Sequence, residues 1–375
     1  MGRLHAVNPM RITRIELFKA EIAFLEPFRI SLTTSTAARN VFVRIHAEGG
    51  LYGMGEASPT RAITGDTQAT AWAVGQDLAA LLIGREATDI EGANALMRRN
   101  IAGETSIRGA FDNALYDLAA KAASMPLYAF LGGARREYET DNTVSIDTPA
   151  IMAGKARRFI DEGFRAVKVK LGTGAAEDIA RVEAIRDAIG VGIPIRVDAN
   201  QGWDAPTATR ILRAIEDLGV EYAEQPVAHW DTDSMRRVRE SVGIPIMADE
   251  SLFSPFDAAR LASDECCDYF NIKLAKSAGI GPALKIAAIA EAHGIACMVG
   301  CMSETRLGLT AAAHLVSARP IIRFADLDSH VDHEIDPVSG GMTIVDGLVH
   351  LPDGIGVGAD LNPEFLESCE RVQVG

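Results

Sequence analysis

IPIRVDAN at residues 193–200, EYAEQP at 221–226 and IPIMADE at 244–250 are three short apolar stretches, and each closes on acidic or amide side chains. Their length and composition are typical of buried strands, and the residues between them leave room for one helix and two loops. The same pattern continues on both sides, with strands predicted at TVSI (143–146), AVKVKL (166–171), YFNIKLA (269–275), ACMVG (296–300) and IIRFADLD (321–328). Eight predicted strands alternating with helices indicate a parallel α/β fold.

The spacing of these strands is regular. The polar residues that close them stand at positions 170, 198, 224, 249, 273, about 300 and 326, in steps of 24 to 28 residues. A run of eight such strand–helix units favours a closed parallel barrel. The main alternative is an open doubly wound sheet, but no GxGxxG follows the first strand.

The segments on either side of the barrel have a different pattern. Residues 11 to about 56 predict three antiparallel strands, and alanine-rich stretches from about 67 to 130 predict helices with apolar residues three and four apart. The tail contains short strand-like pieces and is expected to pack back on the first domain. We therefore predict an N-terminal α+β domain (1–135), a barrel domain (136–340) and a C-terminal segment (341–375).

Composition narrows the class of protein. The chain has 375 residues, 48% of them hydrophobic, and a formal net charge of −14, which is typical of a globular enzyme and disfavours nucleic acid as a partner. Five cysteines without C-x₂-C pairs indicate neither a disulfide framework nor a zinc knuckle. No apolar run has the length of a signal peptide or a membrane span, so we expect a cytoplasmic protein that does not bind membranes.

Three carboxylates end adjacent strands of the predicted barrel. The C-terminal ends of barrel strands face one mouth, so Asp198, Glu224 and Asp249 are expected to converge. Such a cluster repels itself unless a cation neutralises it. Oxygen ligands indicate Mg²⁺, with Mn²⁺ as a substitute. The alternative is that each carboxylate pairs separately with a lysine or arginine.

Lysines flank these carboxylates. Lys168 and Lys170 lie two apart in one strand and therefore share a face, whereas Lys273 ends a strand on the opposite side of the barrel. A carboxylate bound to the metal has an acidified α-carbon, so one of Lys170 and Lys273 can remove its proton and the other can return one to the opposite face. Lys168 and the metal would lower the pKa of the lysine that acts as base. This arrangement suits a racemase, an epimerase or an elimination; the alternative is that Lys168 and Lys170 are solvated surface residues.

Nine motifs at matching positions resemble those of the enolase superfamily, within the mandelate racemase/muconate lactonizing enzyme family, muconate-lactonizing subgroup, and most closely its dipeptide epimerases. They are GEASPTRAITGD (55–66), TVS (143–145), KVK (168–170), DANQGW (198–203), EQP (224–226), MADES (247–251), NIK (271–273), GCMSET (300–305) and DLD (326–328). The resemblance implies a (β/α)₇β modified TIM barrel with an α+β capping domain built from the N-terminal part and the tail. It assigns the metal to Asp198, Glu224 and Asp249, the acid/base pair to Lys170 and Lys273, and an electrostatic substrate contact to Lys168.

The DLD motif narrows the substrate. In dipeptide epimerases the two matching aspartates hold the free α-ammonium group, and Asp326 with Asp328 could make charge-assisted hydrogen bonds to it. The alternative is that they pair with Arg323 or Arg306. Positions that line the substrate site in such enzymes correspond here to Thr143, Cys301 and Ser303.

Two departures from the pattern concern substrate side chains. Epimerases of alanyl-glutamate carry an arginine on the capping-domain loop where this chain has Thr33, and Ser303 replaces an aliphatic residue. The preferred dipeptide is therefore left open. Four polar residues near the predicted mouth are left without a role: Glu56, Glu250, Glu304 and His229.

These observations predict a Mg²⁺-dependent isomerase, a dipeptide epimerase that inverts the α-carbon of the C-terminal residue by 1,1-proton transfer through a metal-stabilised enolate. Alternatives on the same scaffold are N-acylamino acid racemase, o-succinylbenzoate synthase and muconate cycloisomerase chemistry. A third possibility is a binding protein that has lost its chemistry. A homo-oligomer is expected because barrels of this kind often assemble.

Overall fold

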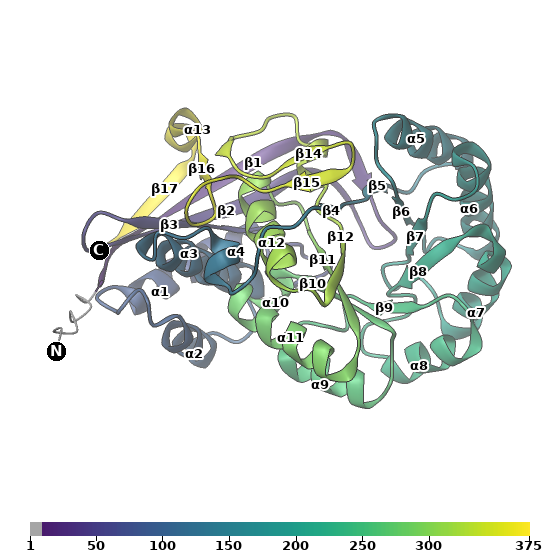
Figure 1. Cartoon of the computed structure of the whole chain (residues 1–375), viewed down its shortest axis with the longest axis horizontal. Coiled ribbons are helices and arrows are strands. Elements are labelled where there is room, and N and C mark those ends of the chain that lie inside the picture. Colours follow the sequence, from purple (N-terminus) through teal and green to yellow (C-terminus); the bar gives the residue numbers. More distant parts are fainter. Residues whose placement is uncertain (1–9) are drawn as a thin grey trace.

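Eight parallel strands form the central sheet of the computed structural model, which describes residues 10–375 (Figure 1). They are β5 (Asn142–Val144), β6 (Val167–Lys170), β7 (Ile195–Asp198), β8 (Val220–Glu224), β9 (Ile246–Ala248), β10 (Tyr269–Lys273), β11 (Ala296–Gly300) and β12 (Ile322–Ala325). Strands adjacent in sequence are adjacent in the sheet. The two ends of this curled sheet meet, because Asp141 N donates to Ala325 O at 3.4 Å and Leu327 N to Thr140 Oγ1 at 2.9 Å. The predicted closed barrel is confirmed, and the alternative of an open doubly wound sheet is wrong.

Helices cover the outside of the barrel. The seven long ones are α5 (Pro149–Asp161), α6 (Ala175–Ile189), α7 (Ala205–Ala214), α8 (Thr232–Ser241), α9 (Pro255–Ser263), α11 (Ile280–His293) and α12 (Arg306–Ala318). Side chains at Asp204, Asp231 and Ser254 each accept a backbone hydrogen bond in the first turn, so the sequence fixes where α7, α8 and α9 begin. The short elements α10 (Leu274–Ser277) and η1 (Glu216–Leu218) complete the connections. A 3₁₀ turn, η2 (Ser329–Asp332), follows β12 in place of an eighth helix, which gives the (β/α)₇β arrangement.

The N-terminal part packs against one side of the barrel (Figure 1). Its antiparallel sheet has the order β17-β1-β2-β3, with β1 (Ile12–Arg29), β2 (Thr34–Ala47), β3 (Tyr52–Ala57) and β17 (Glu370–Val374). It is joined by α1 (Gln68–Leu82), α2 (Ile90–Asn100), α3 (Thr105–Ala122) and α4 (Leu127–Phe130). One face of this sheet buries Ile15, Val43 and Phe111 of α3 in a core separate from that of the barrel. The three predicted strands are confirmed, and β1 and β2 continue into a hairpin over residues 23–38, which includes the capping-domain loop expected around Thr33.

The C-terminal residues return to the N-terminal sheet. Strand β17 pairs antiparallel with β1, with Val374 opposite Ile15. Before it, β14 (Thr343–Val345) and β15 (Leu348–His350) form a small sheet with β4 (Tyr138–Glu139), β13 (Val338–Gly340) pairs with β16 (Ala359–Leu361), and α13 (Pro363–Ser368) leads into β17. Within residues 10–375, no helix is both long and apolar enough to cross a membrane.

A buried histidine should make folding sensitive to acid. His314 of α12 accepts a hydrogen bond from Tyr128 N at 3.1 Å through Nδ1, so Nε2 carries the proton and donates to Val357 O at 3.0 Å. Burial lowers the pKa of His314 to about 4. In the unfolded chain the imidazole takes up its second proton near pH 6.5, whereas in the folded protein it does so only near pH 4. Acidification from pH 7 to pH 5 should therefore lower the free energy of unfolding by about 2 kcal/mol through this residue.

Urea denaturation at pH 7 and pH 5 measures this cost. His314→Gln should remove that part of the pH dependence, whereas His293→Gln, at an exposed position, should leave it unchanged. An equal loss of stability on acidification in wild type and His314→Gln would show that His314 does not contribute.

Candidate active site

Three neighbouring strands bring three carboxylates together at the mouth of the barrel. Asp198 ends β7, Glu224 ends β8 and Asp249 follows β9, and none of the three side chains is exposed. One carboxylate oxygen from each lies within 4.8 Å of the others. The apolar residues that alternate with them, such as Val197 and Ala223, pack into the core of the barrel domain. The convergence predicted from strand spacing is therefore present.

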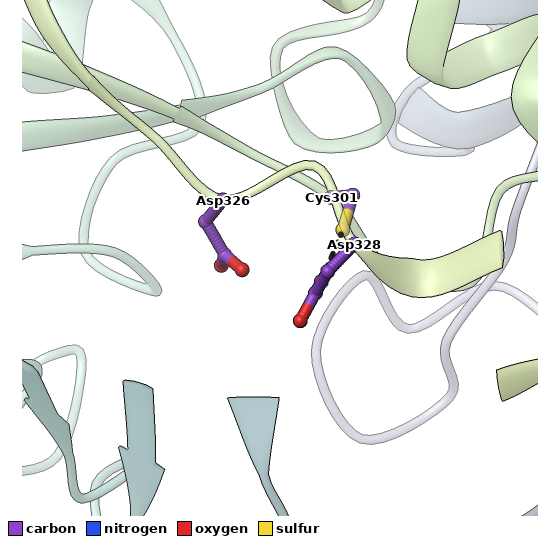
Figure 2. A group of neighbouring side chains, drawn as sticks. All are labelled: Cys301, Asp326 and Asp328. Atoms are coloured by element: carbon purple, nitrogen blue, oxygen red, sulfur yellow. Dashed lines mark hydrogen bonds between the residues drawn. The ribbon is translucent and has the colours of Figure 1, made fainter. Parts of the chain in front are cut away.

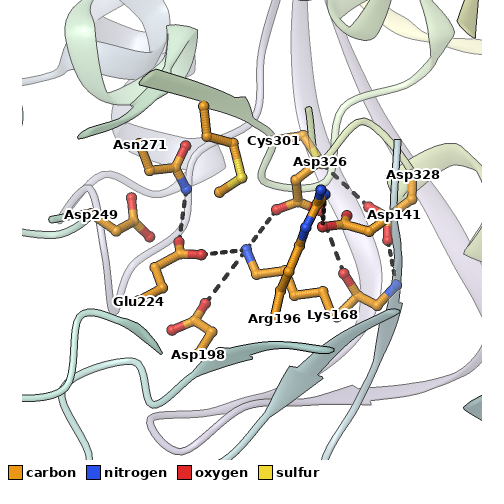
Figure 3. Close-up of polar contacts among 12 residues, drawn as sticks. Asp141, Lys168, Arg196, Asp198, Glu224, Asp249, Asn271, Cys301, Asp326 and Asp328 are labelled. Atoms are coloured by element: carbon orange, nitrogen blue, oxygen red, sulfur yellow. Dashed lines mark hydrogen bonds and ion pairs between the residues drawn. The ribbon is translucent and has the colours of Figure 1, made fainter. Parts of the chain in front are cut away.

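Lysine ammonium groups contact these carboxylates, and Figure 3 shows that of Lys168 between Asp198, Glu224 and Asp326. Lys168 Nζ lies 2.8 Å from Glu224 Oε2, 3.6 Å from Asp198 Oδ2 and 2.6 Å from Asp326 Oδ2. Lys276 Nζ contacts Asp249 Oδ1. The carboxylates do pair with lysines, as the alternative expected. The pairs are not separate, however, because Lys168 contacts three carboxylates at once. Lys168 and Lys170 are buried, so the alternative of solvated surface lysines is wrong.

The donor set fits a hard divalent cation. All the donors are carboxylate oxygens, and the buried atoms Glu224 Oε2 and Asp249 Oδ1 contact only the ammonium groups of Lys168 and Lys276. Burial and the neighbouring Asp198 raise the pKa of Glu224 to about 7. Burial also opposes ionisation of Asp249, but Lys273 and Lys276 hold the pKa of this carboxyl well below its usual value. So much negative charge in one buried place is stable only beside cations.

Lys170 and Lys273 lie on either side of the carboxylates. Lys170 is on β6 and Lys273 on β10, and β7, β8 and β9 run between them. Lys170 Nζ donates to Asp198 Oδ2 at 2.6 Å, and Lys273 Nζ to Asp249 Oδ2 at 2.9 Å. Burial alone would lower the pKa of Lys273, but Asp249 outweighs it and the pKa is raised. The sequence argument expected a lowered pKa for a lysine base; the ion pair with Asp249 accounts for the difference.

A cavity of about 580 Å³ lies above this cluster, between the barrel mouth and the hairpin of β1 and β2. Lys170 and Lys273 line it. So do the predicted substrate-site residues Thr143, Cys301, Ser303, Asp326 and Asp328, as well as Thr33 of the hairpin. Lys168 does not line the cavity and has no exposed surface, because it lies two residues before Lys170 on β6. The predicted contact of Lys168 with the substrate stays a prediction.

Asp326 and Asp328 form an acidic wall of the cavity, with their side chains directed into the same space (Figure 2). Asp326 is paired with Lys168, which together with Lys170 keeps the pKa of Asp326 below its usual value in spite of burial. Asp328 Oδ2 accepts from Thr143 N at 2.7 Å, and Cys301 Sγ lies 3.6 Å from Asp328 Oδ1. Burial and the charge of Asp326 raise the pKa of Asp328 to about 7.

The alternative partners of these aspartates, Arg306 and Arg323, do not bind them. Arg306 binds Asp336 Oδ2 at 2.5 Å and backbone carbonyls of the C-terminal segment. No ion pair joins Arg323 to either aspartate in the described part of the chain. Asp328 therefore faces the cavity without a cation of its own.

Glu56 and Glu304 hold the loop that presents Cys301 and Ser303. Glu56 of β3 accepts from Thr305 N at 2.8 Å and Gly308 N at 2.9 Å, so it fixes the start of α12 from the capping domain. Glu304 accepts from Met302 N at 2.6 Å, and burial next to Glu56 raises the pKa of Glu304 to about 7. Neither glutamate lines the cavity.

Glu250 and His229 lie outside the main cavity as well. Glu250 accepts from Asn200 Nδ2 at 3.1 Å, and burial beside Asp249 raises the pKa of Glu250 to about 8. His229 is exposed and bonded to Gln201. These contacts organise the loops around the strand ends.

Two buried residues of the cluster were missed by the sequence analysis. Asn271 Nδ2 donates to Glu224 Oε1 at 2.7 Å, and Lys276 Nζ donates to Asn271 O at 3.1 Å as well as contacting Asp249. Period two along β10 places Asn271 on the same inward face as Lys273, and Lys276 is the one charged residue in the stretch LAKSAGIG (274–281). Those signals could have identified both.

Comparisons with known proteins agree with this geometry. The family described as mandelate racemase/muconate lactonizing enzyme, N-terminal domain, matches residues 13–132, and the one described as enolase C-terminal domain-like matches residues 151–365. A D-Ala-D/L-Ala epimerase of Cytophaga hutchinsonii is 43% identical over 97% of this chain and 99% of its own. An L-Ala-D/L-Glu epimerase of Bacillus subtilis is 39% identical over 93% of this chain and 96% of its own.

A solved structure is similar to this chain in both fold and sequence. The dipeptide epimerase of Cytophaga hutchinsonii, complexed with Mg and the dipeptide D-Ala-L-Val, superimposes with a TM-score of 0.96 at 43% identity, covering 98% of this chain and all of that one. These relatives are isomerases, and this chain is likewise an enzyme of the isomerase class. With both of its domains matched, the chain belongs to the mandelate racemase/muconate lactonizing enzyme family of the enolase superfamily.

Proposed function

We propose that this enzyme is a Mg²⁺-dependent dipeptide epimerase that inverts the α-carbon of the C-terminal residue. The observation that carries the proposal is the position of Lys170 and Lys273 on two sides of one cavity whose wall also contains Asp326 and Asp328. The two lysines suit proton transfer at opposite faces of one carbon, and the two aspartates suit a substrate with an ammonium group. The similarity to dipeptide epimerases over nearly the whole chain supports the same reading.

Asp198, Glu224 and Asp249 would hold the magnesium ion, and Mn²⁺ could substitute for it. When bound, the ion polarises the substrate carboxylate and stabilises the negative charge that develops as the α-proton leaves. The solved relative complexed with Mg supports this choice of metal. Lys168, beneath the floor of the cavity, helps to balance the charge of Glu224 and Asp326.

The two lysines carry the proton. A lysine without its proton takes the α-hydrogen at Nζ, and the lysine on the opposite side, as an ammonium, donates a proton from its Nζ to the other face of the carbon. In the reverse direction the roles of Lys170 and Lys273 are exchanged. Both side chains are buried at their strand ends, so bulk water does not compete for the proton.

Asp326 and Asp328 would bind the free ammonium group of the N-terminal residue. A dipeptide whose amino group is acetylated should therefore be turned over at least about tenfold less efficiently than the free dipeptide, because a buried carboxylate loses its cationic partner. Comparing kcat/KM for the two compounds tests the proposal. Equal turnover, or faster turnover of N-acyl amino acids, would instead favour the N-acylamino acid racemase or o-succinylbenzoate synthase reactions.

Binding should weaken in acid through Asp328. The pKa of this carboxyl is raised to about 7 by burial and Asp326, so the ionised form that binds an ammonium group is lost as the pH falls through 7. We expect KM for a dipeptide to rise about tenfold between pH 8 and pH 6. Asp328→Asn should have a high KM at both pH values. A wild-type KM that stays constant over this range would contradict the assignment.

The hairpin wall favours apolar side chains in the substrate. It contributes Phe28, Ile30 and Leu32 to the cavity. Two arginines line the cavity outside the hairpin: Arg39 pairs with Glu21 at 2.9 Å and Arg61 is exposed, so neither gives a buried cation to a substrate carboxylate. A buried carboxylate without a partner is unfavourable.

Dipeptides ending in an apolar residue should therefore have a kcat/KM at least about tenfold above that of alanyl-glutamate. Steady-state kinetics on alanyl-glutamate and alanyl-valine make the comparison. A preference for alanyl-glutamate would show that the wall supplies a cation after all.

A further inference from the structure

Gln225 follows Glu224 directly in the sequence and is buried, and both the oxygen and the nitrogen of its side-chain amide make hydrogen bonds. Its Oε1 accepts from Asp249 N at 3.0 Å and Ser251 N at 3.1 Å, and its Nε2 donates to Val227 O and Ser251 Oγ, both at 2.9 Å. Two donor hydrogens and two acceptor positions are all that an amide has. The side chain therefore connects the end of β8 to the segment that follows β9.

The backbone at Gln225 is in the left-handed region, with φ of 35°. This conformation is unfavourable for a residue other than glycine, and it persists where surrounding contacts impose it. Gln225 N still donates to Met247 O at 2.9 Å, and Gln225 O accepts from Gln201 N at 2.9 Å. The chain thus turns sharply at Gln225 while it stays bonded to β9 on one side and to the segment that follows β7 on the other.

The sheet itself does not hold Asp249. Strand β9 is only three residues long, and its pairing with β8 ends at Glu224 opposite Met247. Asp249 therefore lies beyond the last paired residues, and its N–H is satisfied by the Gln225 side chain. The charges of Glu224 and Asp249 also repel each other.

We propose that Gln225 is a positioning residue that sets the spacing of Glu224 and Asp249 and so the affinity of the carboxylate set for Mg²⁺. This inference rests on the proposed function, because it takes Asp198, Glu224 and Asp249 as the metal ligands. Gln225 does not line the cavity, and its side chain bonds to none of the three carboxylate groups. It acts through Asp249, whose backbone it fixes at the side where β9 stops.

The test is calorimetric titration of metal-free protein with MgCl₂. Gln225→Met keeps the approximate size of the side chain and removes all four hydrogen bonds, so Kd for Mg²⁺ should rise about 10- to 100-fold. Gln201→Met is the matched control, because Gln201 also has a left-handed backbone (φ of 68°) but its side chain binds His229 and no carboxylate residue. Its Kd should stay within about twofold of wild type. A folded Gln225→Met protein with the wild-type Kd would overturn the proposal.

Two further measurements separate positioning from general stability. Gln225→Gly should melt at a higher temperature than Gln225→Ala in EDTA, because glycine tolerates the left-handed backbone. Both variants should nevertheless bind Mg²⁺ equally weakly. Affinity that follows the melting temperature across the variants would mean that Gln225 serves only folding.

The affinity for Ca²⁺ should fall less than that for Mg²⁺ in Gln225→Met, because Ca²⁺ accepts irregular coordination whereas Mg²⁺ requires a nearly octahedral arrangement. Equal losses for the two ions would contradict control of spacing. If wild-type protein bound no Mg²⁺, the proposed function itself would fail. If it bound Mg²⁺ and epimerised dipeptides while Gln225→Met bound the ion equally well, only this inference would fail.

Discussion

Replacing Lys170 or Lys273 by alanine should lower kcat for epimerisation by about 10²- to 10⁴-fold, the contribution typical of a positioned acid or base. Inversion needs a proton to leave one face of the α-carbon and another to arrive at the opposite face, so removal of either lysine interrupts it. Lys285→Ala is a suitable control, because Lys285 is an exposed lysine that pairs with Glu91 and does not line the cavity. It should keep wild-type kcat.

In D₂O, the two-lysine arrangement predicts that each alanine variant exchanges the α-hydrogen of only one epimer. With Lys170→Ala, the remaining Lys273 should still exchange the α-hydrogen of the one epimer whose hydrogen faces it, and Lys273→Ala should exchange that of the other epimer. Proton NMR of each pure epimer measures exchange and inversion separately. Wild-type rates of inversion in either variant would rule out a requirement for both lysines.

Removal of divalent metal should abolish turnover, and Mg²⁺ should restore it. Because the carboxylate cluster concentrates negative charge that a bound cation would balance, Asp249→Asn should also lower kcat/KM by at least about 10³-fold, corresponding to several kcal/mol of lost charge stabilisation. Activity after dialysis against EDTA, with and without added MgCl₂, gives the first result, and steady-state kinetics of the variant gives the second.

The variant also needs a control for folding. Asp257→Asn changes an aspartate in the first turn of α9 that accepts from Phe253 N and lies outside the main cavity, and this variant should keep its dependence on Mg²⁺. Full activity of the wild-type enzyme in EDTA would contradict a catalytic metal at Asp198, Glu224 and Asp249.

The barrel could be predicted because its strands are short, apolar and evenly spaced. Each strand end carries a polar residue, and parallel strands in a closed barrel bring these ends to one mouth. The hairpin over residues 23–38 was harder to predict, since the pairing of β1 and β2 shifts register between Ala23 and Phe28 and the alternation of apolar and polar residues is lost there. Pairing with a neighbouring strand holds this segment extended, and local sequence does not reveal it.

For the site, the sequence predicted which face of its strand each residue lies on. Period two gives the face on which Lys168 and Lys170 lie, but not their depth, and so Lys168 was expected in the cavity although it is buried below it. Gln225 was missed for a different reason. Its contacts depend on a left-handed backbone at a strand end, and glutamine is not a residue type whose sequence pattern predicts that conformation.

The central claim is proton exchange at the α-carbon of the C-terminal residue of a dipeptide, and mass spectrometry in D₂O tests it most directly. The enzyme, with MgCl₂, would be incubated with a library of dipeptides that have free amino groups. At least one dipeptide should gain a single deuterium at the α-carbon of its C-terminal residue, and its epimer should appear. If no dipeptide gains deuterium, or if the label enters only N-acylated amino acids, the assignment as a dipeptide epimerase is wrong.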